Sequence, residues 1–438
     1  MEVEINSIEA IKPSKPTPSH RKLHKLSSLD QLSPSIYVPV LFFYRAPLTP
    51  HDRVSLSSQL KSSLSETLTH YYPFAGKMIK DGVHIDCDDM GALFLETRAK
   101  NNLVDILTLP KLEALSMLFP DDLQWKSSKN SRVLAVQVCY FDCGGLSIGI
   151  CISSKIADAC TIVTFLNDWA TYARKTGNSG LPSICPLFNT SLSILFPPSD
   201  QIVVPEIEFT IANVVTRRYV FHSTKISELK ANIVSNSKIL ENPTRVEVVT
   251  SLMYKSIIQA NKIRSLGLVK TFMLAQTVNM RPRMVPSLPR NTIGNIVWYF
   301  PVIIIDNDDI SLETLATQMR ESFLKLCDVA KNVEGKGWLL IEGKLVNDAE
   351  HSLNNAYKFS SWCRYPIYEV DFGWGSPIWV STAEYPYQNS VIMMDSKDGE
   401  GIEAWVTLDE EVMYVFQSDE ELLKFASLNP SIYDNMQN

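Results

Sequence analysis

The sequence predicts an α+β (α/β) protein of two domains, each built on a mixed β-sheet. A chain of 438 residues with 45% hydrophobic content exceeds what one ordinary core accommodates, and two domains are the usual solution. Strand-like and helix-like segments are interspersed in both halves, without the sustained βαβα alternation that a parallel sheet requires. Between the halves, Leu181–Ser199 is rich in proline and weakly periodic, which predicts a crossover.

The first half predicts a strand, a helix, two more strands and a second helix, in that order. The first helix repeats leucine every four residues, so one face is apolar. The two later strands are joined by Asp142–Gly145, in which two glycines favour a tight turn. The second helix has apolar residues at i, i+3, i+4 and i+7. The segments are Val40–Tyr44, Leu56–Leu68, Val133–Phe141, Leu146–Ile152 and the helix that carries Ile162, Phe165, Leu166 and Trp169.

The second half repeats this mixture of elements. Short apolar or β-branched runs bounded by turn residues predict strands, and longer segments with helical spacing predict helices. The predicted strands are Arg217–Phe221, Phe272–Asn279, Ile293–Ile305, Ile367–Val370, Trp379–Thr382, Val391–Asp395 and Gly401–Thr407. The predicted helices are Ile226–Ser235, Val246–Ala260, Leu312–Val329 and Glu410–Leu428.

Charge and composition exclude several classes of function. The net charge is −7 with 20% charged residues, so the chain has no electrostatic reason to bind nucleic acid or an anionic membrane. Met1–Pro18 lacks the apolar core of a signal peptide, and no apolar run reaches the ~20 residues that span a bilayer. The eight cysteines are scattered without a C-x-x-C pair. We therefore expect a cytoplasmic protein with reduced, buried thiols and no metal site.

One junction between a strand and a helix stands out. The strand Leu146–Ile152 ends at Ser153, and the next helix begins shortly after Asp158. Junctions of this kind place side chains at the edge of a rigid support, where substrates can reach them. The sequence of the junction is Ser153-Ser154-Lys155-Ile156-Ala157-Asp158.

A second motif lies far along the chain, and further short segments accompany it. The motif is Asp371-Phe372-Gly373-Trp374-Gly375. The accompanying segments are Leu29-Asp30-Gln31, Tyr71-Tyr72-Pro73-Phe74-Ala75-Gly76, Phe196-Pro197-Pro198 and Val278-Asn279-Met280-Arg281-Pro282-Arg283. Together these residues resemble the plant BAHD acyltransferases over nearly the whole chain, and within them the subgroup that acetylates alkaloid alcohols. D-F-G-W-G is the family's specific signature, and the junction resembles its S-H-K-x-A-D motif.

The resemblance implies two similar domains of the chloramphenicol-acetyltransferase type with a solvent channel between them. It places the N-terminal domain at residues 1–185 together with part of 360–400, the crossover linker at 186–215 and the C-terminal domain at 216–438. It further implies a monomer without a permanently bound cofactor. The co-substrate is an acyl-CoA, with acetyl-CoA expected, and the partner is a small-molecule acceptor.

At Ser154 the chain departs from the family, which carries its general-base histidine at this position. A serine hydroxyl does not accept a proton at neutral pH without a base of its own, whereas an imidazole does. The resemblance assigns Asp158 a structural role, paired with Arg281 or, as second choice, with Arg283. It gives Asp371, Phe372, Gly373, Trp374 and Gly375 structural roles too. CoA contacts are expected at Ser251 and Lys255, although solvated helix residues are as good an interpretation.

Three functions remain open from the sequence. The first is acyl transfer from a CoA thioester to a hydroxyl or amine of a plant specialised metabolite, alkaloid-like, in a site altered at Ser154. The second is a repurposed enzyme of the same fold that catalyses elimination, rearrangement or cyclisation. The third is a non-catalytic accessory protein. Retention of Asp158, Arg281 and D-F-G-W-G argues against the third.

Overall fold

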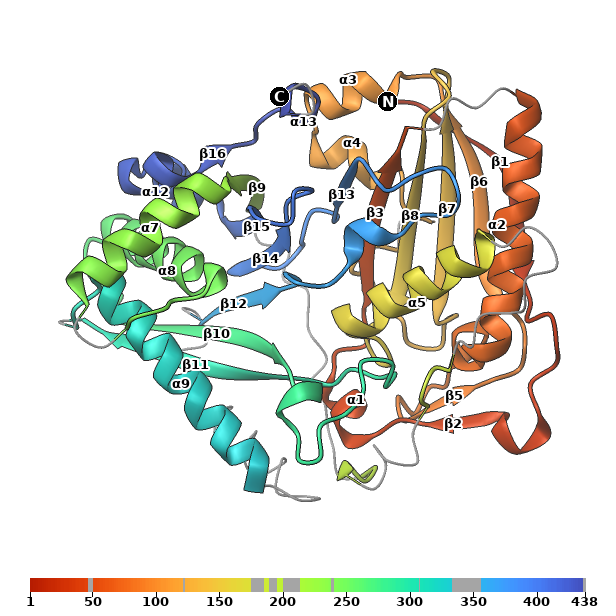
Figure 1. Cartoon of the computed structure of the whole chain (residues 1–438), viewed down its shortest axis with the longest axis horizontal. Helices are drawn as coiled ribbons and strands as arrows, with labels where there is room; N and C mark the ends of the chain where they lie inside the picture. The colour runs from red at the N-terminus through yellow and green to blue at the C-terminus, as the bar shows by residue number, and fades with distance from the viewer. Residues whose placement is uncertain are drawn as a thin grey trace.

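The structure is a computed structural model of the chain, viewed in Figure 1. It describes residues 1–45, 50–120, 123–174, 185–188, 195–199, 213–237, 240–306, 308–332 and 356–435. Most of the predicted crossover, at 189–194 and 200–212, lies outside these ranges.

The first half is organised around a mixed sheet of six strands. In spatial order these are β1 (Val3–Ile11), β6 (Ala92–Ala99), β7 (Leu134–Phe141), β8 (Leu146–Ser153), β3 (Tyr37–Tyr44) and β13 (Trp379–Ser381). β6 and β7 are parallel, and the other neighbours are antiparallel. β13 comes from late in the chain and pairs Val380 with Phe42 of β3. A segment of the second half therefore completes the first sheet.

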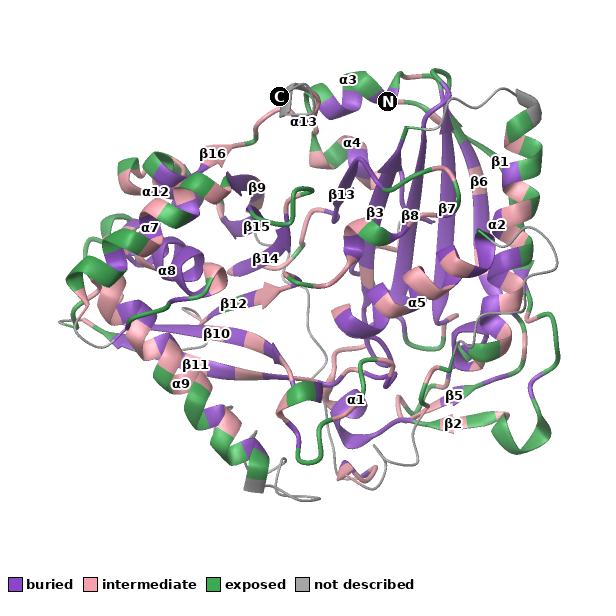
Figure 2. Cartoon of the chain, viewed as in Figure 1, coloured by how far each residue is buried: buried purple, intermediate pink, exposed green. Residues whose placement is uncertain are grey.

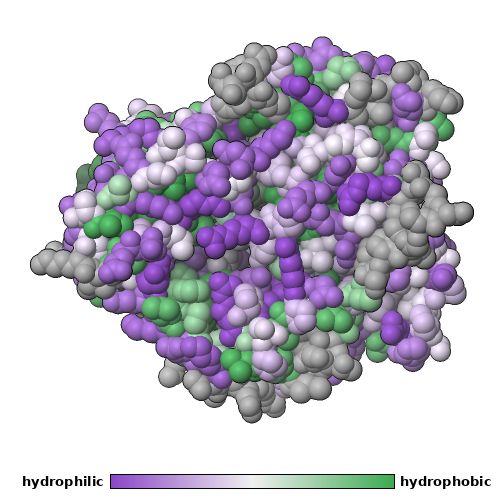
Figure 3. Space-filling model, viewed as in Figure 1, coloured by the Kyte–Doolittle hydropathy of each residue, from purple (hydrophilic) through white to green (hydrophobic). Residues whose placement is uncertain are grey.

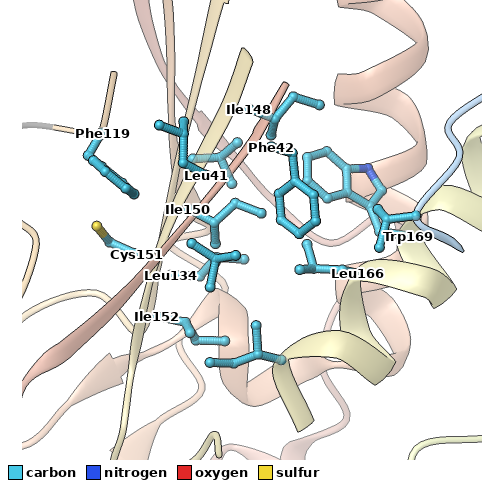
Figure 4. Packing of buried hydrophobic residues seen from close by; sticks show 14 of the residues in the cluster. Leu41, Phe42, Phe119, Leu134, Ile148, Ile150, Cys151, Ile152, Leu166 and Trp169 are labelled. Atoms are coloured by element: carbon cyan, nitrogen blue, oxygen red, sulfur yellow. The ribbon is translucent and has the colours of Figure 1, made fainter. Parts of the chain in front are cut away.

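Two helices cover one face of this sheet, as Figure 1 shows. They are α2 (Pro50–His70) and α5 (Ala159–Ala173). The indole of Trp169 in α5 donates a hydrogen bond to the Leu60 carbonyl of α2 at 3.3 Å. In Figure 4 Leu166 and Trp169 approach Phe42 and the isoleucines of β8, while Phe119 and Cys151 lie across the sheet. β7 and β8 are buried at every position, because both faces of the sheet are covered.

The second half contains a mixed sheet of seven strands. In spatial order these are β11 (Val297–Ile305), β10 (Thr271–Asn279), β12 (Ala356–Ser361), β14 (Ser390–Asp395), β15 (Ile402–Asp409), β9 (Val214–Phe221) and β16 (Ser427–Leu428). The helices α7 (Ser223–Asn236), α8 (Arg245–Arg264) and α9 (Leu312–Asn332) pack with this sheet in a second core, separate from the first.

A small sheet and several short helices complete the described fold. The sheet orders β2 (Leu23–Lys25), β5 (His84–Asp86) and β4 (Lys77–Met78). The short helices are α1 (Ser28–Leu32), α3 (Leu103–Thr108), α4 (Leu112–Ser116), α11 (Glu410–Phe416), α12 (Glu420–Phe425) and α13 (Ile432–Asn435). Within the described ranges, no helix combines the length and apolar character needed to cross a membrane. Four of the eight cysteines are buried, as expected. Cys143 and Cys185 are exposed, and Cys327 and Cys363 are half-buried, so the expectation of burial fails for these four.

The burial pattern shows where the two halves differ. Figure 2 shows the central strands of the first sheet as buried along their length. In the second sheet, β10 and β12 alternate instead: Tyr357 and Phe359 are buried against the helices, whereas Lys358 between them is exposed. On the face of the molecule shown in Figure 3, hydrophilic and hydrophobic residues are interspersed. Lys358 and Ser360, on the other face of β12, line a cavity together with Ser154, so this face of the second sheet is turned toward the first half.

Several predicted elements differ from the structure, and in three of them the difference has a clear physical reason. Ile367–Val370 was expected as a strand but contains a 3₁₀ helix at Ile367–Glu369, which follows Pro366. The predicted closing helix is divided, because Asp419 accepts a hydrogen bond from the Leu422 amide at 3.1 Å and starts α12 as a new N-cap. The strand expected from Ile293 begins only at Val297. The amides of Asn295 and Ile296 bond instead to side chains of the first half.

Candidate active site

A cavity of about 280 Å³ lies between the two sheets. The first half contributes the end of α1 with the loop after it, the start of β3, and the junction between β8 and α5. The second half contributes one face of β10, β11, β12 and β14. Residues that represent these walls are Pro34, Ser154, Ile162, Thr277, Lys358 and Ile392. Both halves of the chain are therefore needed to form the cavity.

Ser154 lines this cavity at the junction between β8 and α5. Its side chain is held by the neighbouring backbone, because its hydroxyl donates a hydrogen bond to the Pro34 carbonyl. The Ser154 amide donates to the Ile36 carbonyl at 2.9 Å, and only 4% of the residue is exposed. No described side chain that lines the cavity is a histidine. Ser154 is thus bound to a carbonyl and has no base beside it to activate it.

Asp158 caps the start of α5 and forms an ion pair with Arg281 from the second half. One carboxylate oxygen accepts the Thr161 amide at 2.8 Å. Arg281 Nη1 lies 2.6 Å from Oδ2 of Asp158, and both side chains are almost fully buried. The Ile296 amide donates to the same oxygen at 2.9 Å. The carboxylate is fully engaged by these donors and does not contact the Ser154 hydroxyl, which bonds to Pro34.

The remaining donors of Arg281 also connect structural groups. Nε donates to the Thr292 carbonyl at 2.9 Å, and Nη2 donates to the Gly294 carbonyl at 3.0 Å. Arg283, the second choice of partner, turns elsewhere and donates to the Asn279 carbonyl at 3.0 Å. Of the two arginines predicted as partners, Arg281 therefore forms the pair in the structure.

Asn295 provides a second link between the halves beside Ser154. Its side-chain amide donates to the Ser154 carbonyl at 2.8 Å. Its backbone amide donates to the Asp30 carboxylate at 2.7 Å. Asp30 lies in a capping box with Ser27, and burial raises the pKa of its carboxyl to about 6 although the Ser27 hydroxyl lowers it. The segment Leu29-Asp30-Gln31 thereby helps to fix the junction that carries Ser154.

Lys155 follows Ser154 but does not line the cavity. Its ammonium group donates to the Gln31 carbonyl at 2.7 Å, and the residue is buried. Burial lowers the pKa of this lysine to about 8, an effect that the nearby Asp30 opposes. Cys160 also points away from the chemistry, because its thiol donates to the Arg290 carbonyl at 3.7 Å. His70 stacks on Tyr172 with ring centroids 5.8 Å apart. None of these three residues reaches the cavity.

The D-F-G-W-G segment packs on the outside of the first half, and none of its residues lines the cavity. The Asp371 carboxylate accepts the amides of Gly373 and Gly375 at 2.8 and 2.9 Å. Phe372 is buried against Trp169, with ring centroids 4.8 Å apart. Trp374 stacks on Phe372 at 5.4 Å.

The two glycines of this segment adopt backbone angles that only glycine takes readily. Gly373 has φ = 113° and Gly375 has φ = 104°. The Phe372 carbonyl accepts the Gln59 side chain of α2 at 3.1 Å. The segment therefore fixes the path of the chain between β12 and β13 over the two helices.

The two residues expected to contact CoA have different environments. Ser251 is fully buried in α8 and donates to the Glu247 carbonyl at 2.8 Å, so its hydroxyl is not available to a ligand at the surface. The α8 face that carries Ser251 packs into the second core, and the CoA contact expected of this residue stays a prediction. Lys255 is accessible, pairs with Glu421 at 2.6 Å and borders a depression of about 170 Å³.

One residue of the cavity was not anticipated from the sequence. Lys358 projects from β12 and, with Asp158, is one of the two charged residues that line the cavity in the described part of the chain. The sequence does indicate that this lysine faces away from the core, because Tyr357 and Phe359 flank it in a segment long enough to form a strand. The alternation of a strand places a residue between two core aromatics on the opposite face. The strand Ala356–Ser361 was itself not predicted, so this signal was missed.

The arrangement suits a reaction between two bound small molecules. The walls of the cavity come from the two sheets, and the Asp158–Arg281 pair holds the helix start next to Ser154. Such preorganised walls orient reactants. What the cavity lacks at Ser154 is a group that titrates near neutral pH.

Comparisons with known proteins agree with this geometry. Akuammiline synthase 1 of Alstonia scholaris is 38% identical over 424 residues, which cover 95% of this chain and 96% of that protein. The 17,18-epoxy-17-hydroxycur-19-ene N-malonyltransferase of Strychnos nux-vomica is 37% identical over 434 residues, 98% of this chain and 91% of that protein.

Solved structures show the same fold, and the predicted fold class is confirmed. The crystal structure of vinorine synthase superimposes with a TM-score of 0.87 at 32% identity, covering 99% of this chain and 100% of that one. F. sporotrichioides TRI101, crystallised with coenzyme A and T-2, has a TM-score of 0.73 at 16% identity, over 93% of this chain and 99% of that one. The model of the Transferase family matches residues 1–423. The chain therefore belongs to the Transferase (BAHD) family of acyltransferases.

Proposed function

We propose that this protein transfers an acyl group from an acyl-CoA to a hydroxyl or amine of a plant specialised metabolite. The observation that carries the proposal is the cavity between the two halves, with Ser154 on its wall and the Asp158–Arg281 pair intact beside it. The relatives add support, since one is named for N-malonyl transfer and comes from a plant. The alternatives of a repurposed enzyme and of an accessory protein have no observation in their favour.

The reaction proceeds by attack of the acceptor on the thioester carbonyl carbon. A tetrahedral oxyanion forms, and its collapse breaks the C–S bond and releases the CoA thiol. The walls of the cavity hold the two reactants together, and this positioning alone accounts for a large part of such accelerations. Position 154 offers no imidazole to take the proton of the attacking molecule. The Ser154 hydroxyl is already hydrogen-bonded to the Pro34 carbonyl. An amine acceptor needs less help, because its neutral form attacks unaided.

The finer features of the activity are part of the same proposal. We expect acetyl-CoA as donor and an alkaloid-like acceptor, and a monomeric enzyme in the cytoplasm. Lys255 is the proposed contact for CoA, because it borders an open depression and its partner Glu421 is partly exposed. A phosphate of CoA competing for this ammonium group would displace the carboxylate.

An assay with purified protein, acetyl-CoA and a panel of alkaloid alcohols and amines tests the function. Products are read by mass, with malonyl-CoA as a second donor and heat-denatured protein as control. The proposal predicts acylated products, formed faster from amines than from matched alcohols. Binding of CoA without a product from either donor, over the whole panel, would contradict it.

A further inference from the structure

Lys358 carries an uncompensated charge in the central cavity. It lies on β12 between β10 and β14, where Ala275 and Ser390 are its neighbours in register. Its backbone amide donates to the Asn389 carbonyl at 2.8 Å. Over the described ranges, the structure shows no hydrogen bond or ion pair of its ammonium group. Its ammonium group is therefore left to the solvent or to a ligand in the cavity, where it is the one cation among the described lining residues.

The side chain reaches the cavity and not the core. Tyr357 and Phe359 are buried on the helix side of the sheet, and alternation puts Lys358 with Ser360 on the other face. Lys358 is accessible because the cavity admits solvent to it. The walls of the cavity nevertheless restrict the water around its ammonium group, and this desolvation lowers its pKa below the usual 10.5. A larger fraction of the side chain is therefore the neutral amine near neutral pH than in an exposed lysine.

No other group that lines the cavity in the described part is a suitable proton acceptor. The Asp158 carboxylate is held by Arg281. The remaining titratable groups are Tyr299, Tyr365 and Tyr385. Burial raises the pKa of Tyr385 to about 12 and raises that of Tyr365 further, so both stay protonated phenols. β10 and β14 present Thr277, Asn279, Ser390 and Ile392 to the cavity, none of which titrates near neutrality.

We propose that Lys358 is the proton acceptor of the acyl transfer, on the wall of the cavity that faces Ser154. This inference rests on the proposed function. The neutral amine of Lys358 takes the proton of the acceptor as the acceptor oxygen or nitrogen bonds to the thioester carbonyl carbon. When the tetrahedral oxyanion collapses, the C–S bond breaks. The ammonium group then returns the proton to the CoA thiolate, so that Lys358 ends the cycle neutral and the products are the acylated acceptor and CoA.

Two substitutions of Lys358 distinguish its ability to accept a proton from its positive charge. Lys358→Arg keeps a positive charge but cannot give up its proton, and Lys358→Met keeps an unbranched chain without either property. Both variants should lower kcat/KM for acetyl transfer about 100-fold. The affinity for CoA, measured by calorimetry, should stay unchanged. The control is Lys270→Met, whose side chain is 65% exposed and lies outside the cavity.

The pH profile adds a test that needs no variant. The kcat/KM of the unaltered enzyme should rise with pH through the pKa of Lys358, because only the neutral amine accepts a proton. This rise should be absent from the residual activity of Lys358→Arg. Adding Ser154→His to Lys358→Met should restore transfer, with the inflection moved to about 6.5.

The outcomes separate this inference from the proposed function. Absence of acyl transfer by the unaltered enzyme contradicts the proposed function. Acyl transfer by the unaltered enzyme that persists within about threefold in Lys358→Met overturns the inference and leaves the function standing. Loss in Lys358→Met but not in Lys358→Arg also overturns it, because charge, as in binding a carboxylate, would then be the role of the lysine.

Discussion

The guanidinium of Arg281 and the carboxylate of Asp158 form a buried ion pair that joins the two halves of the chain, with Nη1 and Oδ2 2.6 Å apart. Asp158 is at the same time the N-cap of α5, four residues after Ser154. The pair therefore sets both the position of the second half and the start of the helix at the cavity wall.

Replacing Arg281 by Met should lower the free energy of unfolding by about 3–5 kcal/mol, because the Asp158 charge is left buried without its partner. Urea unfolding followed by circular dichroism measures this loss. The matched control is Lys270→Met, which removes an exposed pair with Asp306 and should change stability by less than about 1 kcal/mol. Equal effects of the two substitutions would show that the buried pair does not have the structural role assigned to it.

Asp30 should make the protein less stable as the pH rises from about 4 to about 7. Its pKa in the folded state is about 6, above the 3.8 of an unperturbed carboxyl, so folding favours the protonated form. The resulting contribution of about 3 kcal/mol is fully present below pH 4, decreases as the pH rises through the folded pKa of about 6, and is lost by about pH 7. In Asp30→Asn this contribution cannot titrate. The free energy of unfolding of the unaltered protein should therefore fall relative to that of Asp30→Asn between pH 4 and pH 7. A difference that stays constant over this range would contradict the raised pKa of Asp30.

Phe372→Ala tests whether D-F-G-W-G is structural. Phe372 is buried between Trp169 and Trp374, so truncation should lower the free energy of unfolding by about 3–5 kcal/mol. Since the segment does not line the cavity, KM for acetyl-CoA of the folded protein should stay within about twofold. A raised KM in protein that is still fully folded would place the segment in the binding site instead.

Ser154→Ala should have little effect on acyl transfer, less than about threefold. The hydroxyl donates to the Pro34 carbonyl and has no base beside it, so it neither attacks the thioester nor accepts a proton. Initial rates with one matched acceptor measure this. A loss approaching 100-fold would instead identify the hydroxyl as a participant in the chemistry.

Much of the fold follows from local patterns in the sequence. β7 and β8 were predicted to within one residue at each end, because apolar runs are strong signals where both faces of a strand are buried. The four apolar residues expected on one face of the next helix all lie in α5. The strand expected from Ile293 begins at Val297, since Asn295 and Ile296 bond to Asp30 and Asp158 of the other half. These hydrogen bonds depend on how the two halves pack against each other, and a local sequence pattern does not predict that packing.

The site was predictable in part. The junction at Ser154 and the partner of Asp158 were expected from motifs, and the structure brings these residues together. The burial of Ser251 could not be predicted, because its position on α8 does not reveal that the face it occupies packs against Met319 of α9. Lys358 was missed because its role depends on its surroundings in space. The sequence does not show that this lysine lies in a cavity formed by both halves of the chain, where no described carboxylate lies beside its ammonium group.

The acyl-transfer rate of Ser154→His tests the central claim most directly. If the cavity still holds acyl-CoA and acceptor in reacting geometry, an imidazole at this position supplies a base whose pKa lies near the operating pH. Initial rates with acetyl-CoA and one matched acceptor near pH 7 should then rise by about 100-fold, with a new inflection near pH 6.5. No gain in transfer by a folded variant that binds CoA as tightly as the unaltered protein would contradict the account.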